Sequence, residues 1–318
     1  MKTIDRALGK TAFRVVPTAC FMAAQHLCQY IRPVESHPWS TLPRSQQLAF
    51  KIAFIAICHE FNWDFLQSRL AEVLLDDPVN LAERLATVDS RQVREWLLDY
   101  PRQERVQAPK RAALLRDVGR VLLARWHGDA ATLIADTGGR LAGNGGFLQE
   151  LDHFAAYRSD PLHKKSQVLV HDLIRESIMR FDDENVVEPA VDYHLIRIYV
   201  RTGRVVPLDP ALDPFFEGHP RPRGRLMLLL RETVSEAAKL TAMYAKIPVP
   251  DINYVEWQLA RVICRVEGPG CEQAPRGDLP HDVAGLVGTT CPYNGFCEKF
   301  NRKPDRVLRE PQFSKGYY

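Results

Sequence analysis

The sequence predicts a mostly α-helical protein. Strand signals are scarce along its 318 residues, and no internal repeat is visible. Apolar residues instead recur at spacings of three and four, as in RAALLRDVGRVLLARW at residues 111–126. The segment from Ser45 to Phe61 is apolar nearly all round after its first turn, which is the pattern of a helix buried in the middle of a bundle. We therefore expect a helical bundle.

The composition describes an ordinary soluble globular protein. Apolar residues make up 46% and charged residues 25%, and a net charge of +3 does not by itself require a nucleic-acid partner. The apolar run from Val15 to Ala24 is interrupted by Pro17 and Thr18, so we read no signal peptide, and no stretch approaches a membrane span. In a cytoplasmic protein the thiols stay reduced, which favours metal ligation over disulfides.

Several helix starts can be placed from capping residues. Asn80 and Ser90 are predicted caps of the helices that follow them. The run Asn62, Trp63, Asp64 is read most simply as a turn with a helix cap and a core aromatic ring. A pocket wall is the alternative, because an aromatic ring beside an amide can stack on and hydrogen-bond an extruded base.

Residues 147–181 predict two helices joined by a tight turn at Ser159, Asp160 and Pro161. Lys164 and Lys165 fall in the first turns of the second helix. Backbone N–H groups at such a helix start can dock a DNA phosphate. An ordinary helical hairpin with solvated lysines is the competing interpretation. The glycines at 138–146 before it carry no phosphate-loop fingerprint and indicate a loop.

Asp192 occupies an N-cap position. Pro189 forces an extended approach, the helix YHLIRIYVRT follows, and Gly203 is suited to a left-handed end. From the residues alone this aspartate is either a cap or a catalytic carboxylate.

A loop rich in proline and arginine leads into the next long helix. Its arginines offer a surface for a DNA backbone, as does the basic tail, although a solvated tail is the commoner meaning of such a stretch. The loop residues are Arg221, Arg223 and Arg225, and the tail residues are Arg302, Lys303, Arg306 and Arg309.

Four of the seven cysteines form the group C-x6-C-x19-C-x5-C at Cys264, Cys271, Cys291 and Cys297. Four thiolates from a helix end and its following loops can hold a metal or an iron–sulfur cluster. Structural zinc sites usually use paired C-x2-C knuckles, which are missing here, so zinc is the alternative to a 4Fe–4S cluster.

Together these motifs resemble the helix–hairpin–helix (HhH-GPD) DNA glycosylase superfamily, in its iron–sulfur branch typified by endonuclease III and adenine glycosylase. That branch ends in a helix leading into C-x6-C-x2-C-x5-C. Here the x6 and x5 spacings recur, while the middle gap is x19. The segment V-D-Y-H at 191–194 matches the family's catalytic V-D-x-H, and S-D-P-L-H-K-K stands where the family has its L-P-G-x-G hairpin.

The resemblance implies a role for several residues. Asp192 would be the catalytic aspartate, which the helix dipole keeps charged so that it stabilises an oxocarbenium-like sugar. Lys165 or Lys164 would be the Schiff-base nucleophile of a bifunctional member. His194, in the matching V-D-Y-H segment, would contact the substrate, and on the pocket-wall interpretation given above Asn62, Trp63 and Asp64 would contact it as well. The four cysteines would hold a structural 4Fe–4S cluster.

The expected architecture follows from the same resemblance. We expect a six-helix barrel domain at 40–205, with the hairpin and the catalytic aspartate, and a cluster domain formed by 1–39 plus 206–318. The expected function is excision of a damaged or modified base from duplex or single-stranded DNA by a cytoplasmic, nucleoid-associated monomer. The alternatives are a glycosylase acting on RNA or a modified nucleoside, and an inactive iron–sulfur DNA-binding protein.

Overall fold

The computed structural model describes residues 12–34, 36–216, 220–221, 224–297 and 312–313. Over these ranges the chain forms thirteen α-helices, and the strands have two or three residues each, which confirms the mostly helical prediction. No helix in this part of the chain is long and apolar enough to cross a membrane. The chain divides into two compact units. We call Val34–Val187 the middle unit, and the segments up to Pro33 and from Glu188 onward the terminal unit.

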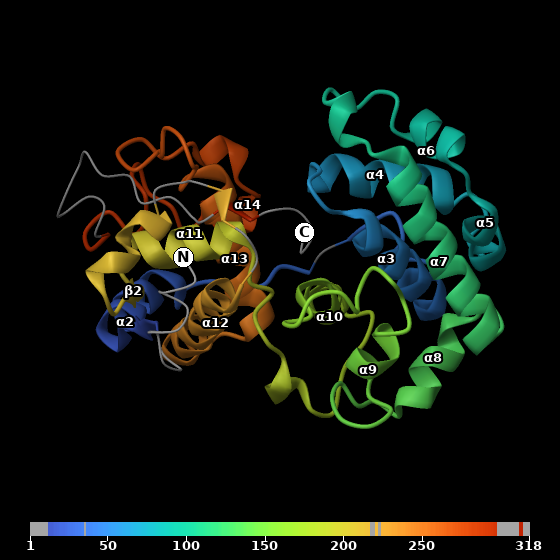
Figure 1. The fold of residues 1–318 in the computed structure, drawn as a ribbon, viewed down its shortest axis with the longest axis horizontal. Helices are drawn as coiled ribbons and strands as arrows, with labels where there is room; N and C mark the ends of the chain where they lie inside the picture. The colour runs from blue at the N-terminus through green and yellow to red at the C-terminus, as the bar shows by residue number, and fades with distance from the viewer. Residues whose placement is uncertain (1–11, 35, 217–219, 222–223, 298–311, 314–318) are drawn as a thin grey trace. The chain divides into compact units, whose positions relative to one another are not determined.

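The middle unit contains eight helices among its described residues (Figure 1). They are α3 (Arg44–Ile57), α4 (Trp63–Leu74), α5 (Leu81–Thr87), α6 (Ser90–Trp96), α7 (Ala108–Trp126), α8 (Ala130–Thr137), α9 (Phe147–Leu151) and α10 (Lys164–Arg175), with short 3₁₀ turns at Gln103–Arg105 and Glu184–Val186.

Helix α3 is the centre of the middle unit, in contact with α4, α5, α7, α8 and α10. Every residue from Gln47 to Ile57 is buried, as the continuous apolar run predicts. The one lysine in this run, Lys51, is buried with them. Its ammonium binds Asp172 of α10 at 2.9 Å and Glu176, the C-cap residue of that helix, so this buried charge is paired.

The packing of α7 on α5 depends on a glycine. A Cβ added to Gly119 on α7 would lie 2.3 Å from the backbone nitrogen of Ala86, so no larger residue fits without separating the helices. Close approach of these two helices fixes one side of the middle unit.

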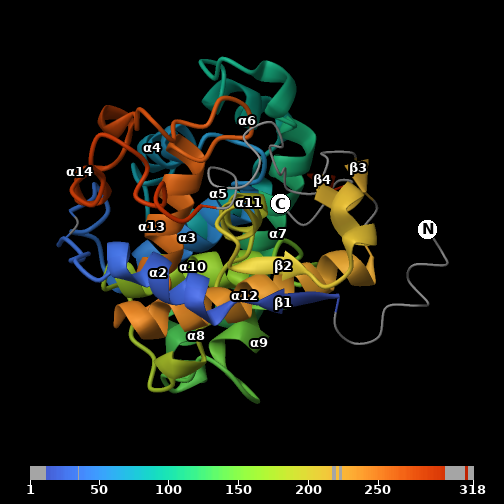
Figure 2. The same ribbon diagram turned by 90° about the vertical axis from the view of Figure 1, so that its left-hand side faces the viewer.

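The terminal unit joins both ends of the chain around one core. Its helices are α2 (Pro17–Leu27), α11 (Tyr193–Arg201), α12 (Arg225–Ala245), α13 (Val249–Val262) and α14 (His281–Ala284). Strands β1 (Phe13–Val15) and β2 (Val205–Pro207) pair antiparallel, with Arg14 opposite Val206, beside α12 (Figure 2). Strands β3 (Pro220–Arg221) and β4 (Gln312–Phe313) pair in parallel. Short 3₁₀ turns cover Pro210–Phe216 and Arg276–Asp278.

The unit boundaries lie at 33/34 and 187/188, whereas the sequence places domain boundaries at 39/40 and 205/206. The difference moves α11, and Asp192 with it, into the unit that carries the cysteines. Its physical reason is that α11 packs on α12 and α13, and that β2, which follows α11, pairs with β1.

Capping predictions are confirmed at some helices and wrong at others. Asn62 caps α4 by accepting a bond from Phe65 N at 2.9 Å. Asn80 occupies the N-cap of α5 but makes no side-chain cap bond. Ser90 is not the cap of α6: Asp89 is, in a reciprocal capping box with Gln92.

Candidate metal centre and active-site residues

The four grouped cysteines lie just after α13 and in the loops that follow. Cys264 comes two residues beyond the end of the helix, and its backbone N–H bonds Leu259 O at 2.9 Å. The N–H of Cys291 bonds the carbonyl of Cys271 at 3.0 Å, and that of Cys297 bonds Tyr293 at 2.9 Å. The bond between Cys291 and Cys271 joins two cysteines that are 20 residues apart in the sequence.

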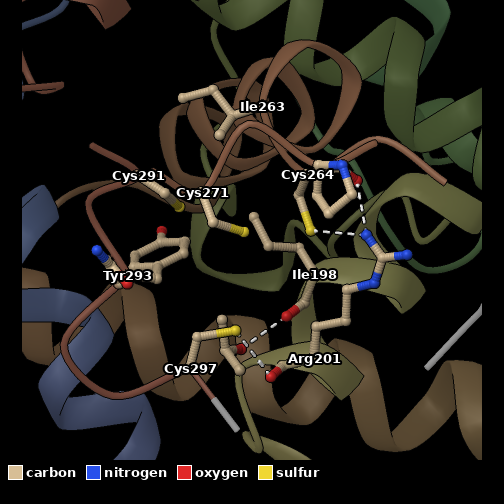
Figure 3. A pocket seen from close by; sticks show the side chains of 11 residues that line it. Ile198, Arg201, Ile263, Cys264, Cys271, Cys291, Tyr293 and Cys297 are labelled. Atoms are coloured by element: carbon tan, nitrogen blue, oxygen red, sulfur yellow. Dashed lines mark hydrogen bonds between the residues drawn. The ribbon is translucent and has the colours of Figure 1, made fainter. Parts of the chain in front are cut away.

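All four cysteines line a single pocket (Figure 3). Its walls come from α11, from the end of α13 and from the loop at 269–297. The lining residues are Ile198, Arg201, Thr202, Ile263, Cys264, Pro269, Cys271, Cys291, Tyr293, Asn294 and Cys297.

Arginines of α11 bind the first cysteine. Arg201 donates to Cys264 Sγ at 3.3 Å, and to the carbonyls of Arg265 and Val266 at 2.7 and 3.2 Å (Figure 3 shows the bond to sulfur). Arg197 donates to the carbonyl of Cys264 at 2.6 Å. Helix α11 therefore holds the end of α13 in place through its own side chains.

Burial raises the pKa of the Cys291 thiol to about 12, and the charges of Cys264, Cys271 and Cys297 raise it further. The four thiols thus interact electrostatically across the pocket. Within the described ranges, however, no three His, Cys, Asp or Glu side chains are arranged to hold a metal ion. The cysteines share a pocket without the close convergence of a ligand set around one ion.

A fully buried ion pair supports one wall of the pocket. Arg204 and Glu256 are completely buried and lie 2.6 Å apart. Tyr293 donates its hydroxyl to Glu256 at 2.7 Å, and the Arg204 guanidinium lies 3.7 Å from the Tyr199 ring centroid. Removal of one partner would leave a buried charge without its counter-charge. The bond from the Tyr293 hydroxyl to Glu256 also holds the ring of Tyr293 at the pocket.

Asp192 caps α11, as predicted, and is 5% exposed. One carboxylate oxygen, Oδ1, accepts bonds from His194 N and Leu195 N at 2.8 and 3.0 Å. The other oxygen, Oδ2, accepts no hydrogen bond within the described part of the chain. Half of this carboxylate therefore orders the helix start, and the other half is available to a ligand.

His194 lies in a group of rings beside this cap. Its ring is 4.1 Å from that of Tyr193, which is 37% exposed, and meets Trp257 edge-on at 5.9 Å. Arg197 bonds His194 Nδ1 at 2.8 Å. A substrate contact by His194 stays a prediction.

The two candidate lysines are in the middle unit, and the structure distinguishes them. Lys165 points to the C-terminal end of α3, where Nζ donates to the carbonyl of Ala56 at 2.6 Å. Burial lowers its pKa to about 8; Cys58 opposes this shift, while Lys164, Lys110 and Arg111 add to it. A structural role as a cap of α3 and a chemical role as a partly neutral amine are both compatible with this position.

The other predicted contacts are dispersed. Asn62 and Asp64 are exposed at the start of α4, and Trp63 is half-buried, edge-on to Phe54 at 4.5 Å, so the helix-cap interpretation accounts for them. Arg225 is exposed and begins α12. Arg221 contributes backbone to β3, while Arg223 and the tail cations lie outside the described residues.

Several residues around these sites escaped sequence reasoning. Arg197 and Arg201 recur at a spacing of four within an otherwise apolar helix, a pattern that could have marked an inward-facing pair. His59 is 3% exposed, and nothing in its local sequence distinguishes it from a helix-end residue.

A comparison with protein-family models finds no match for this chain, and a search of curated proteins likewise finds none.

Proposed function

We propose that the protein is an iron–sulfur glycosylase that excises a damaged or modified base from DNA. The observation that carries the proposal is the position of Asp192, which caps the same helix whose arginines hold Cys264. As the N-glycosidic bond lengthens, positive charge builds on the sugar, and the oxygen Asp192 Oδ2 would stabilise it.

A lyase step would use Lys165. Its amine lone pair would form a bond to C1′ while the base leaves with the electrons of the glycosidic bond, and the amine would then lose a proton. The nitrogen lone pair would next form the C=N bond of the Schiff base as the C1′–O4′ bond breaks and O4′ takes up a proton, which opens the sugar ring. A pKa of about 8 leaves a useful neutral fraction at physiological pH, which supports this lysine over Lys164.

The pocket of Cys264, Cys271, Cys291 and Cys297 would hold a 4Fe–4S cluster. Zinc is the alternative occupant of the same four thiolates. When bound, the cluster would order the loops after α13 and supply no redox chemistry.

Under this proposal the partner is DNA and the chain acts as a monomer in the cytoplasm, at the nucleoid. The middle unit would correspond to the six-helix barrel domain of the helix–hairpin–helix glycosylases, and the terminal unit to their cluster domain. A glycosylase acting on RNA or a modified nucleoside is the second candidate. It is favoured by the segment before α10, which turns through a left-handed histidine, His163, where the family has glycines.

The decisive experiment measures free base from a panel of duplexes and single strands carrying different lesions, together with modified RNA. Asp192→Asn is expected to abolish release, because asparagine preserves the cap but carries no charge. Asp89→Asn is the matched control, since Asp89 Oδ1 also accepts two N–H bonds at a helix start. Full activity in Asp192→Asn would refute the assignment.

Two further measurements separate the parts of the proposal. Borohydride should trap a covalent protein–DNA adduct that is lost in Lys165→Ala and kept in Lys164→Ala. Cys271→Ser should bleach the visible absorbance of the purified protein. An unchanged spectrum would contradict the assignment of the cluster and would leave the assignment of Asp192 unaffected.

A further inference from the structure

Three chain segments meet in the middle unit at the C-terminal end of α3. Arg111, from the first turn of α7, is fully buried and donates to the carbonyls of Ile57 and His59, the latter at 2.9 Å. Lys165, from the first turn of α10, donates to Ala56 at 2.6 Å. The starts of α7 and α10 are thereby fixed against the last turn of α3 and the residues just after it.

Each of these segments turns through a non-glycine residue in the left-handed region. The φ angles are 53° at Glu60, 44° at Gln107 and 48° at His163. Such residues are uncommon, and they concentrate where a ligand or an active site imposes the backbone. Glu60 immediately follows His59, and the other two immediately precede the cationic first turns of α7 and α10.

His59 is buried at this junction with neither ring nitrogen hydrogen-bonded in the part of the chain that the structure describes. Burial lowers its pKa to about 2, and the charges of Lys165, Arg111, Lys110 and Lys164 lower it further. A neutral imidazole still carries one N–H, so the ring presents a buried donor facing a set of cations. Its complement is an anionic oxygen.

The carboxylates at the junction are already engaged. Glu60 accepts from Gln107 Nε2 at 2.9 Å, and Asp160 accepts from Leu162 N and Lys164 N at 3.1 and 3.0 Å. Neither α7 nor α10 has a side-chain cap at its N-cap residue. The local balance therefore favours a further negative charge.

We infer that His59, Lys110 and Lys164 form an anion site that binds a phosphate group of the nucleotide substrate. That the ligand is a nucleotide rests on the proposed function, whereas the anion site itself rests on the unpartnered ring of His59 and the cations around it. Lys110 is exposed and Lys164 half-exposed, so both can reach a phosphate at the surface, with the His59 N–H beneath it. Lys165 and Arg111 donate hydrogen bonds to backbone carbonyls, and they would attract the phosphate through their positive charge.

Binding of a fluorescent oligonucleotide with a reduced abasic-site analogue tests the site in the full-length Asp192→Asn protein. Lys110→Gln and Lys164→Gln should each weaken binding about three- to tenfold and reduce the salt slope by about 1. Arg120→Gln, at an exposed cation on the same helix α7, should change neither. Affinities equal to that of Arg120→Gln in both lysine variants would overturn the proposal.

The ring signals of His59, followed by NMR, identify the source of the phosphate. Inorganic phosphate, a nucleoside monophosphate and the oligonucleotide are titrated separately. A shift with the oligonucleotide alone supports an internal phosphodiester, and a shift with the smaller anions supports a terminal phosphate. No shift with any of them overturns the site. If the wild-type chain releases no base but these shifts persist, the glycosylase proposal fails and the anion site stands.

Discussion

The two units bury charge in opposite ways. In the terminal unit Arg204 and Glu256 are completely buried and form an ion pair, and Tyr293 donates its hydroxyl to Glu256. At the junction in the middle unit Lys165 and Arg111 are held by carbonyls, and His59 lies among cations with no partner for its ring. The buried cation of the terminal unit thus has a carboxylate counter-charge within the described chain, whereas the ring of His59 has no hydrogen-bond partner there.

The middle unit also contains a control for this contrast. Lys51 is as deeply buried as Arg204, yet two carboxylates, Asp172 and Glu176, neutralise it. The chain can therefore supply acidic partners to buried cations in this unit. The unpartnered ring of His59 is the observation behind the proposed anion site.

The largest expected effect comes from breaking the buried ion pair of Arg204 and Glu256. Glu256→Gln leaves Arg204 buried without a counter-charge, which should cost about 3–5 kcal/mol of the free energy of unfolding. Chemical denaturation measures it, with Glu236→Gln at an exposed position of α12 as the control. A loss no greater than that of the control would show that the pair is dispensable.

The second largest effect is expected from Lys165, at the C-terminal end of α3, when stability is measured at alkaline pH. The pKa of Lys165 is lowered to about 8 in the fold, so between pH 8 and 10.5 the unfolded chain binds the extra proton and stability rises with pH. The gain relative to Lys165→Met should reach about 3 kcal/mol across this window. Parallel stability curves for the two proteins would mean that Lys165 is fully charged in the fold.

A smaller effect on the free energy of unfolding is expected from His59 at acid pH. Because the pKa of His59 falls to about 2, the unfolded chain protonates first, and stability is lost as the pH falls below about 6.5. Between pH 6.5 and 5 the wild type should lose about 2 kcal/mol more than His59→Gln. The same loss in both proteins would place the ring in a more solvated position than the structure gives it.

Much of this organisation is local and could be predicted from the sequence. The buried helix α3, the caps Asn62 and Asp192 and the left-handed end at Gly203 depend on a few neighbouring residues. The grouping of four cysteines in one pocket agrees with their spacing. Ser90 was misplaced as a cap because Asp89, beside it, completes the capping box with Gln92.

The remaining features are set by tertiary contacts. The sequence could not choose between Lys164 and Lys165, since the choice depends on which side chain reaches Ala56, 109 residues away. Nor could it give a role to His59, whose surroundings come from the starts of two distant helices. The boundary at 187/188 likewise reflects the packing of α11 on α12 and α13.

The smallest stability effect is expected at Asp192, and it separates a cap from a catalyst. Asparagine caps a helix about as well as aspartate, so Asp192→Asn and Asp89→Asn should each change the free energy of unfolding by no more than about 0.5 kcal/mol. Each aspartate accepts its cap bonds through Oδ1, but Asp89 is exposed, whereas Asp192 is 5% exposed and lies next to Tyr193. Loss of base release at unchanged stability would therefore assign the charge of Asp192 to catalysis. A loss of both together would return this residue to a structural role.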